Sequence, residues 1–255
     1  MVSSGGRRAT GSGPAGRHGG SRGRWDLGAG DAEAVLAEAR RAFFVMAGFL
    51  AVVWVLQIAN WADHYRITLD YGIRPRDIGS LPDVISAPFL HFSWAHIEGN
   101  SGPLLIFGFL AAYRGVRKFI WVTILIIVTS GLTAWLAEPS NTVGAGASGL
   151  VFGYFGYIMV RGFFDRHPID MVIGVIMALS FAYQFSVLVP RAGIGWQAHI
   201  GGLAGGVAAG WIFRERHPKA PAKPAPATGT TSGLNFRGTQ PGTLRKPSDP
   251  GSPAP

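Results

Sequence analysis

Long apolar runs, separated by short polar connections, make up the middle of the chain. Six of them fit the roughly 17–25 residues that a membrane-spanning helix needs. They cover residues 43–59, 96–113, 119–136, 146–160, 171–189 and 197–213. The second run is the weakest because it contains Glu98 and Pro103. Buried helices of a soluble protein are the alternative, but six such runs in so short a chain leave little polar surface to face water. The pattern predicts an all-α membrane protein with a six-transmembrane-helix bundle.

Both ends of the sequence differ from its middle. Residues 1–36 are polar and rich in glycine and arginine, and residues 216–255 are rich in proline, glycine, serine and threonine. Segments of this composition cannot bury enough apolar surface to offset the entropy lost on ordering. We therefore expect disordered tails at 1–36 and 216–255 around one membrane domain at 37–215. The N-terminal tail also lacks the pattern of a signal peptide.

The composition agrees with a membrane protein. Hydrophobic residues make up 48% of the chain and charged residues 15%, whereas an average soluble domain has about 25% charged residues. The net charge of +9 is spread over the tails and the short loops rather than gathered in one patch. This distribution argues against nucleic-acid binding and favours contact with an anionic bilayer surface. The chain has no cysteine, which excludes disulfides and thiol catalysis.

The Lys and Arg residues of the loops predict an orientation. One side of the membrane would carry Arg40, Arg41, Arg114, Arg117, Lys118, Arg161, Arg166, Arg214, Arg216 and Lys219. The other side would carry Arg66, Arg74, Arg76 and Arg191. Since the more basic side faces the cytoplasm, both termini are expected inside the cell, in a multi-pass protein of the cell (inner) membrane. The long loop at residues 61–90 is then external, ordered and non-spanning.

Polar residues inside membrane helices are expensive and mark functional sites by default. His96, Asn100, Ser148 and His199 lie near the external ends of their predicted helices. Because the second, fourth and sixth helices would run in the same direction, these four side chains should lie at a similar depth.

Small residues surround Ser148. The segment from Gly144 to Gly149 reads Gly-Ala-Gly-Ala-Ser-Gly and leads into the fourth run, with Gly146 and Gly149 flanking the serine. Ser148 would thus lie at a helix N-terminus, where free N–H groups and the helix dipole favour an anion such as a tetrahedral oxyanion. The alternative is a serine N-cap with packing glycines.

Glycines recur every four residues in two of the runs. They are Gly202, Gly206 and Gly210 in the sixth run and Gly149 and Gly153 in the fourth. Small residues at this spacing allow membrane helices to pack backbone to backbone. Such packing would bring Ser148 within hydrogen-bond reach of His199, as a nucleophile and its general base require. Ordinary helix packing, with the histidine bonded to a neighbouring helix, is the alternative.

The second run begins with two polar residues on one helical face. His96 and Asn100 are four residues apart, and both can donate hydrogen bonds to developing negative charge. A metal site built from His91, His96 and His199 is the competing interpretation. It is disfavoured because no acidic residue shares this face and no HExxH motif is present. Glu98 lies on another face and receives no role.

Together these motifs resemble those of the rhomboid family of intramembrane serine proteases. They are His-x4-His-x3-Asn at His91, His96 and Asn100, Gly-x-Ser-Gly at Gly146, Ser148 and Gly149, and Ala-His-x2-Gly-x3-Gly at Ala198, His199, Gly202 and Gly206. The resemblance extends over about residues 40–215, with the motifs on the matching runs.

The resemblance implies a mechanism. Ser148 would attack a peptide bond in or near the transmembrane segment of a substrate protein, and His199 would take its proton, forming a Ser–His dyad without an aspartate. His96, Asn100 and the Ser148 N–H would form the oxyanion hole. Neither a metal ion nor another cofactor is expected; the partners would be transmembrane substrates and the lipid bilayer.

The resemblance also assigns supporting roles. His91 would brace the external loop, and the fifth helix with the loop at 190–195 would act as a gate. Phe152 stands where the family usually has a tyrosine, so the stack on His199 would be kept and the hydroxyl lost. The alternative is an inactive rhomboid-like protein that binds and escorts membrane clients, but such a protein would be expected to lose the serine or the histidine. A small transporter is disfavoured because we find no internal repeat.

Overall fold

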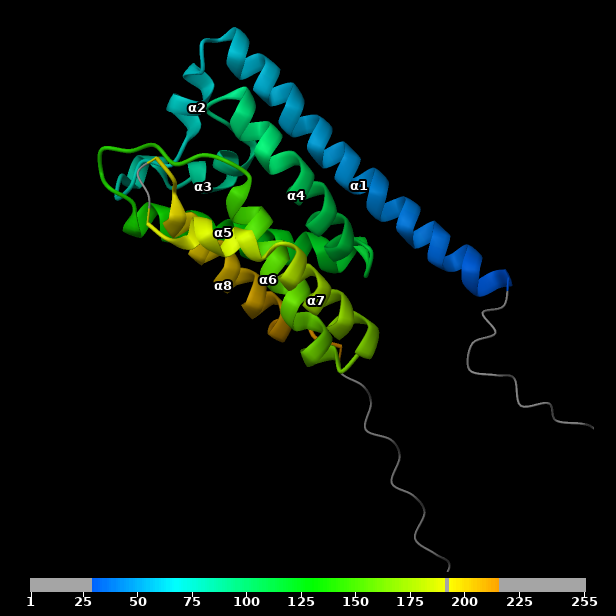
Figure 1. Ribbon diagram of the computed structural model, residues 1–255. Coiled ribbons are helices and arrows are strands. Elements are labelled where there is room, and N and C mark those ends of the chain that lie inside the picture. Colours follow the sequence, from blue (N-terminus) through cyan, green and yellow to red (C-terminus); the bar gives the residue numbers. More distant parts are fainter. Residues whose placement is uncertain (1–28, 191–192, 216–255) are drawn as a thin grey trace, which may run out of the picture. The chain divides into compact units, whose positions relative to one another are not determined.

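The computed structural model describes residues 29–190 and 193–215 as a bundle of helices (Figure 1). The main helices are α1 (Ala29–Ala62), α4 (Trp94–Ala112), α5 (Val116–Ala137), α6 (Ser148–Asp165), α7 (Pro168–Ser180) and α8 (Trp196–Ile212). Short elements connect them: α2 (Arg66–Tyr71), η1 (Ile78–Ser80), α3 (Asp83–Ser86), η2 (Ala87–Phe89) and η3 (Ala182–Leu188). An isolated antiparallel bridge joins Ile73 to Gly144. The predicted all-α fold is confirmed for these residues.

The main helices follow the order of the six apolar runs. Within the described residues, two helices are both long and apolar enough to cross a membrane by themselves, α1 over Ala32–Ala62 and α5. The other four are shorter or carry more polar residues, and α7 has only 13 residues. The six-span topology therefore stays a prediction, although each predicted run overlaps a helix.

Two boundaries differ from the sequence-based expectation. Residues 29–36, which were expected to be disordered, form the start of α1 because the three alanines, the glutamate and the leucine of this stretch have high helix propensity. The fifth run ends as an α-helix at Ser180 and continues as the 3-10 segment η3, whose aromatic and β-branched residues favour an α-helix less. Residues 1–28 and 216–255 of the predicted tails lie outside the described residues.

The connection between α1 and α4 is ordered, as predicted for the loop at 61–90, and its longest helix, α2, has six residues. Asn60 ties it to the bundle, since its side chain donates to His91 O at 2.8 Å and accepts from Thr68 N at 3.0 Å. Arg76 caps α5, because its guanidinium donates to Leu136 O at 3.0 Å and to Glu138 O at 2.8 Å. These bonds satisfy carbonyls that the end of a helix leaves unpaired.

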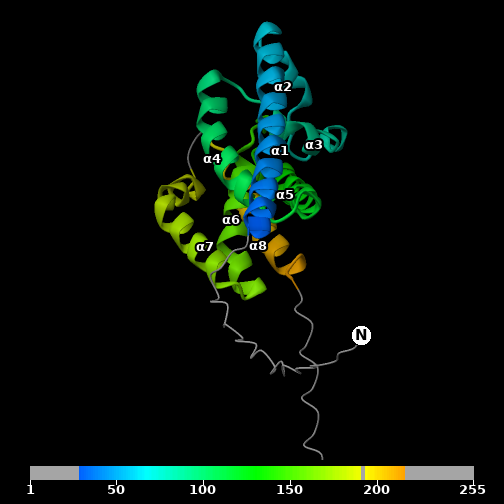
Figure 2. The same cartoon turned by 90° about the vertical axis from the view of Figure 1, so that its right-hand side faces the viewer.

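Helix α6 lies in the middle of the bundle and is contacted by α4, α5, α7 and α8 (Figure 2). Glycines set its distance from α8. A Cβ at Gly202 would overlap the Gly149 carbonyl oxygen, and a Cβ at Gly206 would overlap the Gly153 carbonyl oxygen. The predicted backbone-to-backbone packing of these two helices is confirmed.

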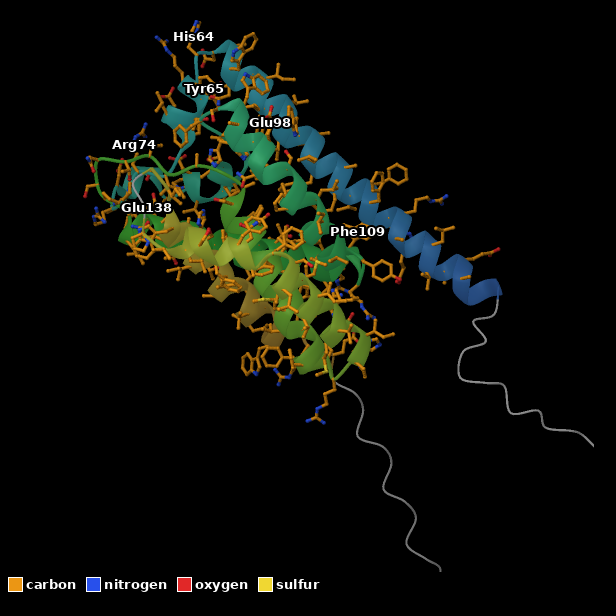
Figure 3. All side chains as sticks on the ribbon, viewed as in Figure 1. His64, Tyr65, Arg74, Glu98, Phe109 and Glu138 are labelled. Carbon is orange, nitrogen blue, oxygen red and sulfur yellow. The ribbon has the colours of Figure 1, made fainter. Side chains whose placement is uncertain are left out.

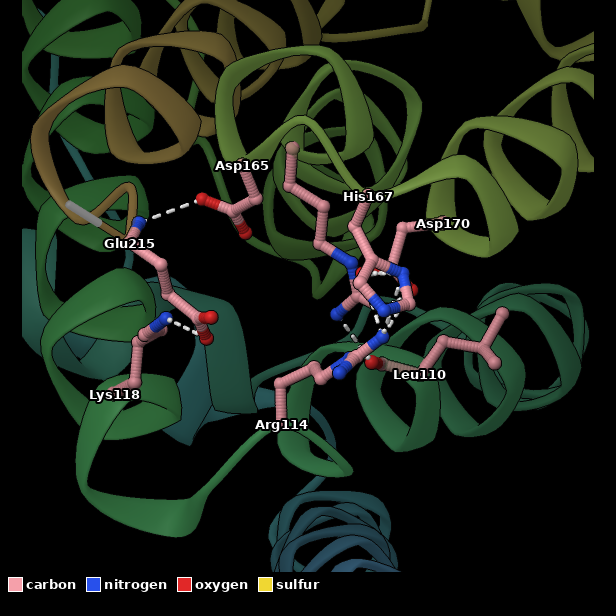
Figure 4. A network of polar contacts seen from close by, with 8 residues as sticks. Leu110, Arg114, Lys118, Asp165, His167, Asp170 and Glu215 are labelled. Atoms are coloured by element: carbon pink, nitrogen blue, oxygen red, sulfur yellow. Dashed lines mark hydrogen bonds and ion pairs between the residues drawn. The ribbon is translucent and has the colours of Figure 1, made fainter. Parts of the chain in front are cut away.

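An ion cluster, drawn in Figure 4, connects the helices near the C-terminal end of α6, whereas Ser148 is at its N-terminal end. Asp170, at the start of α7, binds Arg114 at 2.7 Å and Arg161 at 3.2 Å. Arg161 also donates to Leu110 O of α4 at 2.9 Å. The side chains of Arg161 and Asp170 are 2% and 3% exposed, so removing Asp170 would leave the buried guanidinium of Arg161 without this ion pair. The cluster therefore fixes the start of α7 to α4 and α6.

Candidate active site

Ser148 and His199 meet at the ends of two adjacent helices. Ser148 is the first residue of α6, and His199 lies in the first turn of α8. The distance from Ser148 Oγ to His199 Nε2 is 2.9 Å. This contact follows from the glycine packing, because Gly149 and Gly202 let the first turns of the two helices approach each other directly. The pair has the geometry of a nucleophile hydrogen-bonded to its base.

Phe152 holds the plane of the histidine ring. It lies one turn after Ser148 on α6, and its ring centroid is 4.6 Å from that of His199 with an angle of 22° between the planes. The stack expected from the sequence is present. Since Phe152 has no hydroxyl, it restrains the histidine by ring contact alone.

Ser130 of α5 supports the same region and was not singled out from the sequence. Its hydroxyl donates to Ala198 O at 2.8 Å, next to the histidine. A Cβ at Gly149 would overlap Ser130 Oγ, so the glycine after Ser148 also makes room for this brace. The sequence signal for Ser130 was a serine inside an apolar run. This signal is weak because serine hydroxyls in membrane helices commonly bond to backbone carbonyls.

His96 and Asn100 of α4 form the opposite wall. They line the same cavity of about 790 Å³ as Ser148 and His199. Asn100 Nδ2 is buried, and no described residue accepts a hydrogen bond from it. An unsatisfied buried donor is costly and calls for an explanation. Glu98 is exposed on α4 and does not line this cavity.

Gly146 lies between Ser148 and the two α4 side chains, His96 and Asn100. Its φ of 134° lies in a region that side chains disfavour. A Cβ there would also lie 2.8 Å from His96 Nε2 and 3.8 Å from Asn100 Nδ2. Glycine at this position therefore lets the turn before Ser148 approach both α4 side chains.

His91 contacts the turn before Ser148 as well as the loop that it was expected to brace. Its Nε2 accepts a hydrogen bond from Ala147 N at 3.3 Å. Its carbonyl accepts from Asn60 and Thr68. Burial and the neighbouring His96 lower the pKa of His91 to about 3, so the ring is neutral at physiological pH and can accept the Ala147 bond. His91 thus joins the loop after α1 to the start of α6.

The remaining cavity wall comes from loop residues. Residues 193–195 and Gln184 of η3 line it, whereas residues 191 and 192 of the predicted gate lie outside the described residues. Glu138, which belongs to none of the sequence motifs, also lines it. Among the described residues, no group of three or more His, Cys, Asp or Glu side chains could hold a metal ion.

The arrangement can support acyl transfer. A hydroxyl paired with an imidazole faces a buried amide donor, and the Ser148 N–H is at the positive end of α6. All four polar residues singled out in the apolar runs reach one cavity, together with Gly146 and Phe152.

Comparison with known proteins gives the following similarities. A family model described as Rhomboid domain matches residues 79–216. Rhomboid protease GlpG of Haemophilus influenzae is 24% identical over 69% of this chain and 93% of its own length. Putative rhomboid protease YdcA of Bacillus subtilis is 29% identical over 48% of this chain and 62% of its own. An uncharacterized protein of Mycobacterium tuberculosis is 33% identical over 68% of this chain and 76% of its own.

Proposed function

The chain belongs to the rhomboid family, and from this premise we propose that it is a serine endopeptidase of the membrane. It would cleave peptide bonds in or near transmembrane segments of other membrane proteins. The observation that carries the proposal is the 2.9 Å contact between Ser148 Oγ and His199 Nε2 inside a cavity. The bilayer and transmembrane substrates would be its partners, with both termini in the cytoplasm.

The proposed reaction begins with Ser148. Its hydroxyl proton passes to His199 Nε2 while Oγ attacks the substrate carbonyl carbon, and the carbonyl oxygen becomes an oxyanion. His199 then gives this proton to the leaving amine, which breaks the peptide bond and leaves an acyl ester on Ser148. Water, deprotonated by His199, hydrolyses the ester and restores the hydroxyl.

The oxyanion would be stabilised from two sides. Asn100 Nδ2 is a donor without an acceptor among the described residues, which suits a group whose partner forms only during reaction. His96 and Asn100 both lie close to Gly146. The Ser148 N–H is at the start of the 18-residue helix α6. Donors that are already in place stabilise the charge without reorganising.

We propose that α7 and η3 control access to the cavity. Aromatic contacts hold this segment against the bundle, with Phe181 4.8 Å from Phe107 of α4 and Phe185 5.6 Å from Phe155 of α6, measured between ring centroids. These contacts lie far from the ion cluster that fixes the start of α7. A rotation about that fixed end would separate the rings and open the cavity toward the membrane.

An inactive family member that only binds membrane proteins would need neither the Ser148–His199 contact nor a free donor at Asn100. A fluorophosphonate probe distinguishes the two functions. The purified wild type should be labelled on Ser148, as located by peptide mass spectrometry, because the probe reacts with an activated serine. Ser140→Ala, in an exposed loop, should keep the label. Folded wild type that takes up no label, or Ser148→Ala that still does, would contradict the proposal.

The oxyanion assignment predicts a loss of turnover in Asn100→Ala. We expect kcat to fall about 10²–10³-fold with little change in KM, because the donor acts mainly on charge that develops in the transition state. The assay is cleavage of a fluorogenic transmembrane substrate in liposomes. Glu98→Ala, two residues away on the exposed face of α4, is the control and should match wild type. If both Asn100→Ala and His96→Ala turn over at the wild-type rate, α4 has only a structural role.

A further inference from the structure

Glu138 is a buried acid in the proposed active-site cavity that the reaction does not use. It follows the last residue of α5 (Figure 3), and it is 5% exposed. Among the described residues that line the cavity, no Lys or Arg is present, and Glu138 is the one carboxylic acid. Within residues 29–190 and 193–215, the cavity therefore carries one acidic group and no lysine or arginine facing it.

The carboxyl lies between the two segments that lead to Ser148 and His199. A Cβ at Gly144 would be 2.9 Å from one of its oxygens, and a Cβ at Gly195 would be 2.7 Å from the other. These glycines precede Ser148 and His199 by four residues each. Four residues of chain span at most about 14 Å, so the carboxyl is within reach of the residues that flank the cleaved bond of an extended substrate.

The described part of the chain does not neutralise this carboxyl. The nearby Arg76 directs its guanidinium to Leu136 O, to the backbone oxygen of Glu138 and to Ser140 Oγ. The ion pairs between described residues involve other acids. Burial raises the pKa of Glu138, as expected for an acid without a cationic partner. A cation brought in by a substrate would stabilise the ionised carboxylate and so offset the cost of burying its charge.

We propose that Glu138 determines substrate specificity by binding a basic side chain, lysine or arginine, within about four positions of the cleaved bond. The proposal rests on the proposed peptidase function. A substrate with a base at this position would form a charge-assisted hydrogen bond with the carboxylate. A substrate without it would leave the buried group unpaired, which is how a polar site rejects an analogue.

A purely structural carboxyl would behave differently. The Glu138 carboxylate lies beside the segment that precedes α8 and could stabilise the positive end of that helix. In that case its loss would lower the cleavage rate of all substrates by the same factor. The ratio of kcat/KM for two substrates, measured in one enzyme preparation, separates the specificity role from the structural role. The fraction of folded enzyme affects both values equally and therefore cancels.

The test is a set of substrates that differ in one residue. Lysine or methionine, an uncharged residue of similar length, is placed in turn at four positions on each side of the cleaved bond. The ratio of kcat/KM for lysine over methionine is measured for wild type, Glu138→Gln and Glu98→Gln in liposomes. We expect a ratio of roughly 10–100 at one position in wild type and in Glu98→Gln, and a ratio near 1 in Glu138→Gln.

Two results would overturn the specificity proposal and leave the proposed peptidase function standing. One is a wild type that is labelled by the fluorophosphonate and cleaves the methionine substrates but shows no lysine preference at any position. The other is a preference that survives in Glu138→Gln. A folded wild type that neither takes the label nor cleaves any substrate would instead overturn the peptidase function, and the specificity proposal with it.

Discussion

Ser148→Ala and His199→Ala are each expected to abolish cleavage of a transmembrane substrate, with kcat falling at least about 10⁴-fold. Each variant removes one partner of the 2.9 Å contact, and neither partner can act alone in the proposed proton transfer. The double variant should therefore be no slower than the single ones, since groups that act as a unit do not contribute additively.

The measurement is single-turnover cleavage in liposomes, with a thermal melt in detergent to show that the variants are folded. Ser140→Ala is the control, because it removes a hydroxyl from an exposed loop. Substantial cleavage by a folded Ser148→Ala or His199→Ala protein would remove the basis of the dyad. A further loss in the double variant would show that the two residues act independently.

Gly202→Val is expected to impair both catalysis and folding. Any Cβ at this position meets the carbonyl oxygen of Gly149, which is backbone and cannot turn aside. The new side chain must push α8 away from α6, and a displacement of about 1 Å at the reacting groups can cost on the order of 10²-fold in rate. Overpacking should also lower the free energy of unfolding by about 1–3 kcal/mol.

Ala204→Val is the matched control, since it introduces the same side chain, valine, at an exposed position of the same helix. The neighbouring Leu203 would be a poor control because it packs against Gly156 of α6. Cleavage rate and melting temperature should fall for Gly202→Val and stay near wild type for Ala204→Val. Equal behaviour of the two variants would show that the glycine contact does not position His199.

The candidate site residues predicted from the sequence share one property. His96, Asn100, Ser148 and His199 interrupt apolar runs, where a polar group is expensive enough to be noticed. Glu138 escaped notice because it lies where an apolar run ends and looks like an ordinary loop charge. Its burial depends on Gly144 and Gly195, which reach it from segments far apart in sequence.

The packing of the helices could be predicted from local sequence patterns. The end of α7 and the pairing of the buried charges could not. The glycine repeats predicted the packing of α6 on α8 because the spacing of small residues on one face is a local property. Apolar character alone could not distinguish the end of α7 from the 3-10 segment η3. Arg161 was read as one of the loop charges that set the orientation, yet it is buried against Asp170, a pairing that no local pattern predicts.

The pairing of Arg161 with Asp170 also constrains how the protein is made. In the proposed topology Arg161 lies in the last third of α6, where an unpaired arginine costs less during insertion than the about 2.5–3.5 kcal/mol of the helix centre. Its partner comes nine residues later, at the start of α7. We expect α6 to become more stable once Asp170 has been synthesised and can pair with Arg161. We therefore expect the two helices to be most stable when they enter the bilayer together as a hairpin, and a nascent chain that stops before Asp170 to be degraded faster.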